Sequence, residues 1–188
     1  MRYDWQTLYD SIRSCEKCEL CKNRTNTVIG RGDPKSPVML VGEGPGADED
    51  RLGEPFVGRA GMLLDKILAS VNIGRDSVYI ANVVKCRPPN NRTPLDEEAL
   101  ACLPYLRAQY ALAAPKIIVC LGATAAKHLI SPDIRITRDR GSWFEKKGVW
   151  MLPTYHPAAL LRDETKKRPV WEDFKSLIAK MEELDITL

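Results

Sequence analysis

The chain has 188 residues, of which 44% are hydrophobic and 28% are charged, an ordinary composition for a globular protein. This length favours one domain over residues 1–188, and no apolar run approaches the roughly 20 residues that cross a bilayer. The N-terminus lacks the apolar core of a signal peptide. We therefore expect a cytoplasmic protein without membrane contact, and we exclude the collagen-like, disordered, secreted and membrane classes.

Positive charge is concentrated in one part of the chain. The formal net charge is only +3, but the segment from Arg135 to Arg168 contains nine Lys or Arg residues and only four Asp or Glu residues. A basic region on a nearly neutral body fits a surface that binds a polyanion. A solvated Lys/Arg-rich surface fits the charge pattern equally well.

The first part of the chain alternates strand and helix signals. Residues 38–41 predict a buried strand, and apolar residues at helical spacing over 63–71 predict a helix that stops near Gly74. Residues 78–84 predict a second strand. Thr93 as N-cap and Pro94 in the first turn predict the start of the next helix. Pro104 is expected to kink that helix or to divide it in two.

The second part of the chain continues the alternation. Residues 116–121 and 149–152 predict two more strands, with a helix over 122–129 between them. The C-terminal helix is predicted to place six apolar residues on one face: Val170, Trp171, Phe174, Leu177, Ile178 and Met181. This order predicts an α/β fold with a central, mainly parallel four-stranded sheet and helices on both faces. Ligands bind such sheets outside the carboxyl ends of the strands, which directs attention to Glu43, Asn82, Gly122 and the Tyr155–His156 turn.

The cysteines indicate a metal or redox site. Six of them occur, at positions 15, 18, 21, 86, 102 and 120. A cytoplasmic chain of this size needs no disulfides, so the C-x2-C pair Cys15 and Cys18 indicates metal ligation or redox chemistry. Cys86 and Cys102 are the natural residues to complete a four-thiolate site, which suits zinc and an iron–sulfur cluster equally. Cys21 could replace one of the four.

A glycine turn follows the first strand. Residues 42–46 read GEGPG, which matches neither the G-x-G-x-x-G nor the P-loop pattern. The acidic run over 48–50 would repel a phosphate, so we expect no nucleotide cradle here. A tight turn and a backbone site for a neutral planar ligand, with Phe56 available for stacking, fit equally well.

Two polar residues at predicted strand ends each have a structural and a functional interpretation. Asn82 is either an amide that caps a turn or a reader of a base, because one amide offers both a donor and an acceptor. His156 is either a loop histidine or a functional one, held extended by Pro157.

Several segments taken together resemble a known family. They are residues 42–50, 55–58, 82–89 and 156–162, in register with the cysteine spacing from about Cys15 to Arg162. Their order resembles that of the family 4 uracil-DNA glycosylases. The resemblance implies a three-layer αβα sandwich, a monofunctional enzyme that removes uracil from DNA to leave an abasic site, and a [4Fe-4S] cluster in place of zinc.

The resemblance also implies the residues of both sites. The cluster ligands would be Cys15, Cys18, Cys86 and Cys102, with Cys21 as a bystander. The uracil pocket would comprise Glu43, Gly44, Glu49, Phe56, Asn82 and His156. The DNA contacts would come from Leu160, Leu161 and Arg162.

Each implied residue type suits the chemistry of base excision. Uracil must leave the base stack before its glycosidic bond can be reached. Phe56 would stack on the extruded ring, and Asn82 would accept from N3–H and donate to O4. Glu49 would exclude the C5 methyl of thymine. A neutral His156 donating to O2 would stabilise the uracil anion as it forms.

The remaining implied roles concern water and DNA. Glu43 is the candidate to position the attacking water, with help from Glu49, and backbone groups alone are the alternative. Leu160 or Leu161 would fill the space that the flipped base leaves in the base stack, and Arg162 would bind phosphates.

The sequence leaves three rival hypotheses beside a monomeric enzyme acting on uracil in single- or double-stranded DNA. The first is a glycosylase with a broader range of deaminated bases. The second is a relative that crosslinks to abasic sites, which the residues 86–91 disfavour. The third is a zinc-stapled nucleic-acid-binding module without catalysis. A lyase activity is not expected, because it needs a lysine in the pocket and Lys85 is adjacent only in sequence.

Overall fold

A computed structural model describes residues 4–188, and its centre is a mixed sheet. The strands are β1 (Arg31–Gly32), β2 (Val38–Gly42), β3 (Tyr79–Asn82), β4 (Ile117–Leu121), β5 (Phe144–Lys146) and β6 (Val149–Thr154). Within the described residues they form one six-stranded sheet in the order β1-β3-β2-β4-β6-β5. The neighbours among β2, β3, β4 and β6 pair in parallel, whereas β1 and β5 pair antiparallel at the two edges.

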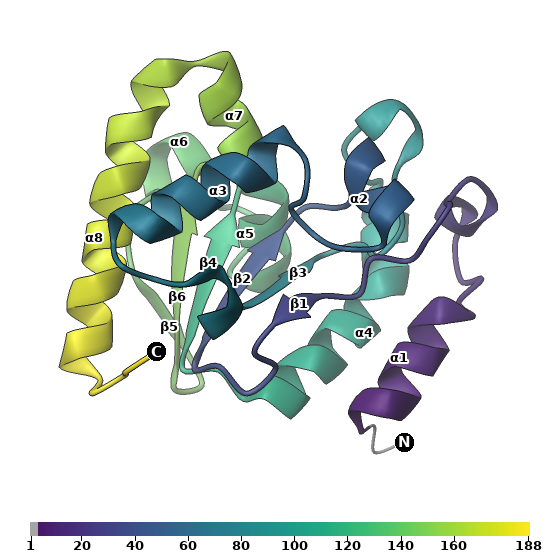
Figure 1. The fold of residues 1–188 in the computed structure, drawn as a ribbon, viewed down its shortest axis with the longest axis horizontal. Coiled ribbons are helices and arrows are strands. Elements are labelled where there is room, and N and C mark those ends of the chain that lie inside the picture. The colour runs from purple at the N-terminus through teal and green to yellow at the C-terminus, as the bar shows by residue number, and fades with distance from the viewer. Residues whose placement is uncertain (1–3) are drawn as a thin grey trace.

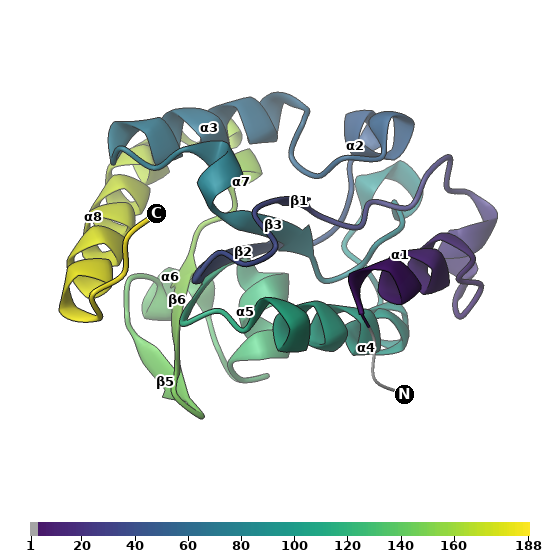
Figure 2. The ribbon, with the colours of Figure 1, turned by 60° about the horizontal axis from the view of Figure 1, so that its bottom comes forward.

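Two layers of helices enclose the sheet (Figures 1 and 2). The helices are α1 (Trp5–Arg13), α2 (Ala47–Leu52), α3 (Arg59–Ser70), α4 (Asp96–Ala113), α5 (Ala123–Leu129), α6 (Ile136–Asp139), α7 (Pro157–Arg162) and α8 (Lys167–Glu183). One apolar core joins α1, α4 and α5 to the sheet, and a second core joins α3, α7 and α8 to the opposite face. Within residues 4–188, no helix is both long enough and apolar enough to span a membrane.

The central strands are buried on both faces. Along β2, Val38 and Leu40 enter one core while Met39 and Val41 enter the other, because successive side chains of a strand point to opposite faces. A strand covered on both sides therefore appears in the sequence as a continuous apolar run. This confirms the predicted three-layer α/β architecture and its four parallel strands.

The number of strands was predicted wrongly. The sheet has two further edge strands, β1 and β5, which span two and three residues. Their side chains are half-buried or exposed and carry no apolar alternation. Such short edges leave no hydrophobic pattern in the sequence, because two or three residues are too few to show the alternation of a strand.

Helix α4 differs from its prediction at both prolines. It begins at Asp96 with Leu95 as its N-cap, so Thr93 and Pro94 lie before the helix. It also continues through Pro104, so the chain is not divided there. Proline cannot donate to the carbonyl of the residue four positions earlier. That residue is Leu100, which is 61% exposed, so the missing hydrogen bond lies near a solvent-facing residue of the helix.

Helix α8 also differs from its prediction at one position. Val170, Phe174, Leu177 and Met181 are buried as expected. Trp171 is 43% exposed, and the amine of Lys175 lies 4.5 Å from its ring centroid. The indole therefore lies at the margin of the apolar face, covered by a lysine, and not within the core.

A buried carboxylate anchors α8 to the end of β6. Asp173 is 2% exposed and accepts hydrogen bonds from the hydroxyl of Thr154 at 2.6 Å and from Nε of Arg140 at 3.0 Å. Arg140 also donates to the carbonyl of Pro169. Thr154 is the last residue of β6 and directly precedes Tyr155. The network therefore fixes the point at which the chain leaves the sheet.

Replacing Asp173 by Ala is expected to lower the free energy of unfolding by about 3 kcal/mol, because Arg140 then stays partly buried without a counter-charge. Urea denaturation measures the change. Glu164→Ala is the matched control, because it removes the carboxylate from an exposed pair with Lys167 and should leave the unfolding midpoint unchanged. Equal midpoints for the two variants would contradict the anchoring role of Asp173.

Candidate active site and cysteine pocket

The carboxyl ends of the four parallel strands meet at one edge of the sheet. Glu43 follows β2, Asn82 ends β3, Gly122 follows β4 and His156 follows β6. They line a cavity of about 470 Å³, which is within the range of small-molecule sites. All six predicted pocket residues line this cavity, and so does Arg162.

Asn82 presents an unsatisfied acceptor in this cavity. The residue is 2% exposed, and its Oδ1 atom has no hydrogen-bond partner among the described residues. Leaving a buried acceptor unpaired costs about 1–3 kcal/mol, so this oxygen is available for a donor on a ligand. Gly42 allows the arrangement, because a Cβ atom there would lie 2.6 Å from Cζ of Phe56 and would also meet Asn82 Oδ1.

Phe56 forms a stacking surface beside His156. Their ring centroids lie 5.6 Å apart with an interplanar angle of 27°. The φ angle of Phe56 is +54°, a left-handed conformation that is rare for a large side chain. Such strain persists only where the surrounding structure imposes it.

Glu49 imposes this conformation. Its carboxylate accepts hydrogen bonds from the backbone N–H of Gly46 at 3.1 Å, of Val57 at 2.9 Å and of Gly58 at 2.8 Å. It thus joins the glycine turn to the segment that directly follows Phe56. The resemblance implied Glu49 only as a contact for the base and as a helper for water, and this anchoring role was not predicted.

Thr124 holds one oxygen of Glu43. The Thr124 hydroxyl donates to Glu43 Oε2, and the carbonyl of Glu43 accepts from the backbone N–H of Val84 at 3.1 Å. The Oε1 atom makes no hydrogen bond within residues 4–188, so it is available to a molecule in the cavity. Sequence reasoning missed Thr124, although a hydroxyl two residues after Gly122, at a strand end, was the signal that could have identified it.

His156 is neutral and has a defined tautomer. Its Nδ1 atom accepts from the backbone N–H of Ala158 at 3.1 Å, so the proton of the neutral ring resides on Nε2. Burial, helped by the charge of Arg162 and opposed by that of Glu49, lowers the pKa of His156 to about 4. At neutral pH the ring is therefore an uncharged donor through Nε2–H.

The structure corrects one of the predicted DNA contacts. Leu160 is 1% exposed and belongs to the core formed with α3 and α8, so it is not available to fill a gap in DNA. Its neighbour Leu161 is 40% exposed. Helix α7 turns successive side chains by about 100°, which directs the first leucine inward and the second outward.

Part of the cavity wall comes from the segment before α4, which the sequence analysis above did not assign to the site. Asn91 and Arg92 line it. The Arg92 guanidinium makes two hydrogen bonds, of 2.7 and 2.8 Å, to the carboxylate of Glu98, which is 2% exposed and also accepts from the N–H of Leu95. This clamp fixes the wall to α4.

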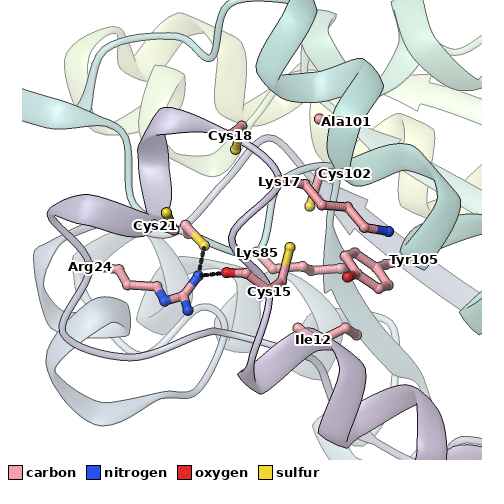
Figure 3. A pocket seen from close by; sticks show the side chains of 11 residues that line it. Ile12, Cys15, Lys17, Cys18, Cys21, Arg24, Lys85, Ala101, Cys102 and Tyr105 are labelled. Atoms are coloured by element: carbon pink, nitrogen blue, oxygen red, sulfur yellow. Dashed lines mark hydrogen bonds between the residues drawn. The ribbon is translucent and has the colours of Figure 1, made fainter.

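Five cysteines line a second pocket, on the side of the sheet that carries α1 and α4. They are Cys15, Cys18, Cys21, Cys86 and Cys102. In Figure 3 the labelled cysteines surround the pocket, with Arg24 on one side and Lys17 and Tyr105 on the other. Within residues 4–188, no three His, Cys, Asp or Glu side chains are already grouped as metal ligands. On donor chemistry, thiols gathered from three segments fit a thiolate-bound centre.

Positive groups adjoin these thiols. Arg24 donates to the carbonyl of Cys15 at 2.6 Å and to the sulfur of Cys86 at 3.4 Å. Burial raises the pKa of Cys102 to about 11, so binding a metal must displace a proton from this thiol. Burial also lowers the pKa of Lys85 to about 8. Lys85 lines this pocket and not the cavity at the strand ends.

Comparisons with known proteins identify the family of the chain. Residues 29–175 match the family model "Uracil DNA glycosylase superfamily". The chain is 47% identical to the type-4 uracil-DNA glycosylase of Thermotoga maritima, over 91% of this chain and 93% of the relative. It is 44% identical to that of Sulfurisphaera tokodaii, over 97% and 85% of the two chains, and 45% identical to that of Archaeoglobus fulgidus, over 88% and 87%. The chain therefore belongs to the uracil DNA glycosylase superfamily and, within it, to the type-4 uracil-DNA glycosylases.

Proposed function

We propose that this protein hydrolyses the N-glycosidic bond of uracil in DNA and leaves an abasic site, the first step of base excision repair. The observation that carries the proposal is the pairing, in one cavity, of an unpartnered amide oxygen on Asn82 with a neutral imidazole donor on His156. The activity is the one that its type-4 relatives are named for.

Base recognition follows from the Asn82 amide. A uracil flipped into the cavity offers N3–H to the unpartnered Oδ1 and accepts at O4 from the Nδ2 group. Cytosine presents the reverse pattern and would leave two buried groups unpaired. Phe56 supplies the stacking surface. The anchored Glu49 is proposed to leave no room for the C5 methyl of thymine.

Bond cleavage leaves positive charge on the sugar and negative charge on the departing uracil. His156 donates through Nε2–H to O2 and stabilises the anion as it forms. Because the imidazole is neutral beforehand, this hydrogen bond strengthens as charge develops on the base. Glu43 holds the attacking water with its unengaged oxygen, and Thr124 fixes the carboxylate in the required orientation.

The cavity rim provides contacts for DNA. Arg162 lies at the cavity and Leu161 is exposed beside it. Lys166 lies 5.5 Å from the ring centroid of Tyr155, which also lines the cavity. Arg162 and Lys166 are proposed to bind phosphates, and Leu161 to occupy the space that the flipped base vacates. The protein is proposed to act as a monomer.

A [4Fe-4S] cluster is proposed as the cofactor, held by Cys15, Cys18, Cys86 and Cys102. Support comes from the single pocket that these thiols line and from the similarity to the type-4 enzymes. Such a centre would fasten the segment after α1 to α4 and to the loop after β3, a structural role. Cys21 lines the same pocket and is proposed to be a bystander. Iron and acid-labile sulfide analysis distinguishes the cluster from zinc.

An oligonucleotide with one uracil, incubated with excess protein and then treated with alkali, is expected to break only at the uracil. His156→Ala is expected to slow this single-turnover reaction by about 100- to 1000-fold, the usual effect of losing one oxyanion donor. Between pH 5 and pH 8 the wild-type rate should show no titration of His156, because its pKa lies lower, at about 4.

Oligonucleotides with thymine or cytosine at the same position serve as controls and should remain intact. No breakage at uracil by protein that retains its metal centre would contradict the proposed activity and favour the non-catalytic, zinc-stapled binding module.

Asn82→Ala is expected to slow uracil excision by about 100-fold, which corresponds to the loss of two hydrogen bonds to the base. Its melting temperature should not fall, because the amide oxygen has no partner in the free protein. Single-turnover assays and thermal unfolding measure the two effects.

Asn26→Ala provides a matched comparison, because its amide donates to the carbonyls of Asp50 and Arg51 outside the cavity. That variant should melt at a lower temperature and excise uracil at the wild-type rate. If Asn82→Ala lowered only the melting temperature and Asn26→Ala lowered only the excision rate, Asn82 could not be the residue that binds the base.

Thr124→Val is expected to slow excision by about ten-fold, since it removes the hydroxyl that orients Glu43 and one such hydrogen bond is worth about 1.4 kcal/mol. Thr124→Ser should restore most of the rate. Glu43→Gln should slow excision further, and adding Thr124→Val to it should have no additional effect if the threonine acts only through Glu43. Additive losses in the double variant would show that Thr124 acts by another route.

A further inference from the structure

Lys85 is a buried cation without an acidic partner. It is 1% exposed, and its ammonium donates to the carbonyl of Asn82 at 2.7 Å and to Oε1 of Gln109 at 2.6 Å. Both acceptors are neutral. Within residues 4–188, no carboxylate forms an ion pair with this side chain. Lysine is almost never fully buried unless its charge is paired, so the arrangement calls for an anion that the carboxylates do not supply.

The cysteine pocket is the place where that anion would lie. Lys85 lines the pocket together with the five cysteines, and Cys86 is the next residue in the chain. Cys86 and Cys102 also line this pocket and are only 6% and 8% exposed, so an anion held by them would lie on the buried side, where Lys85 is.

We propose that Lys85 is the buried counter-cation of a thiolate-bound metal centre and ties that centre to the strand end that carries Asn82. The inference rests on the proposed ligation by the cysteines. Four thiolates outweigh the positive charge of an iron–sulfur core or a zinc ion, so the ligated centre is an anion. Lys85 neutralises it from the buried side, and Arg24 does so from the side nearer the solvent.

The hydrogen bonds of Lys85 connect the cysteine pocket to the backbone of Asn82. Its bond to the Asn82 carbonyl restrains the backbone of the base reader. Its other acceptor, Gln109, is 0% exposed and donates to the carbonyl of Ile29 and to the hydroxyl of Tyr79, both at 2.8 Å. The chain of hydrogen bonds thus runs from the cysteine pocket to both ends of β3. Lys85 is a positioning residue and touches no substrate.

The test compares two substitutions in the metal-loaded protein, purified without oxygen. Lys85→Met removes the charge and the donor, whereas Lys85→Gln removes the charge and keeps an N–H donor for the Asn82 carbonyl. The measurement is the rate at which the visible absorbance of the cluster bleaches in excess EDTA. Both variants are expected to bleach at least about ten-fold faster than the wild type, since unpairing a buried charge costs more than 1.4 kcal/mol.

Lys17→Met is the matched control. Lys17 lines the same pocket, but it is exposed and its amine lies 4.5 Å from the ring centroid of Tyr105. This variant should bleach at the wild-type rate, because solvent screens its charge. The proposal would be overturned if the cluster of Lys85→Gln bleached at the wild-type rate. It would also be overturned if the cluster of Lys17→Met bleached as fast as that of Lys85→Gln. Where Lys85→Met does not fold, Lys85→Gln alone decides the outcome.

The rate of uracil excision by the same samples tests whether Lys85 positions the Asn82 backbone, separately from whether it stabilises the metal centre. In the metal-loaded protein, Lys85→Gln should excise uracil faster than Lys85→Met, because it keeps a donor for the Asn82 carbonyl. Equal rates would contradict the proposed link between Lys85 and Asn82. A colourless wild-type protein that contains zinc would refute the iron–sulfur assignment but not the role of Lys85. The comparison then uses zinc release to a chromogenic chelator, with the same expected order of rates.

Discussion

Parallel pairing of the four central strands is the constraint on which the site depends. Because β2, β3, β4 and β6 run in the same direction, residues that follow them in the chain, from Glu43 to His156, emerge at one edge. The apolar side chains on both faces of these strands hold the pairing in register, and a slip of one residue would turn them all to the opposite face. The pocket is therefore a consequence of how the two cores pack.

Polar groups around this edge fall into two kinds. Some are fully engaged: Glu49 accepts three backbone hydrogen bonds, and Asp173 pairs with Arg140. These groups hold the loops that carry Phe56 and His156. Others lack a partner, above all the Oδ1 atom of Asn82. The groups that are fully hydrogen-bonded make the cavity wall rigid. This rigidity holds the unpartnered group in a fixed position, where a ligand can complete its hydrogen bonds.

The two pockets share one strand end. Asn82 closes β3 and faces the cavity, and Cys86 follows four residues later in the cysteine pocket. The side chain of Lys85 lines the cysteine pocket and donates to the Asn82 carbonyl. A metal centre on the cysteine side would therefore stabilise the segment that positions Asn82, although among the described residues no cysteine lines the cavity itself.

The sequence by itself determined the αβα class, the four central strands and the polar residues at their ends, because strands buried on both faces appear as continuous apolar runs. It also indicated the cysteine centre through its spacing. Tertiary structure decided the edge strands β1 and β5, the inward orientation of Leu160, and the partners of Glu49, Thr124 and Lys85. These features depend on contacts between groups that are far apart in the chain. Neither the periodicity of hydrophobic residues nor the spacing of motifs predicts such contacts. A buried lysine and an exposed one look the same in a sequence, since only packing decides what surrounds them.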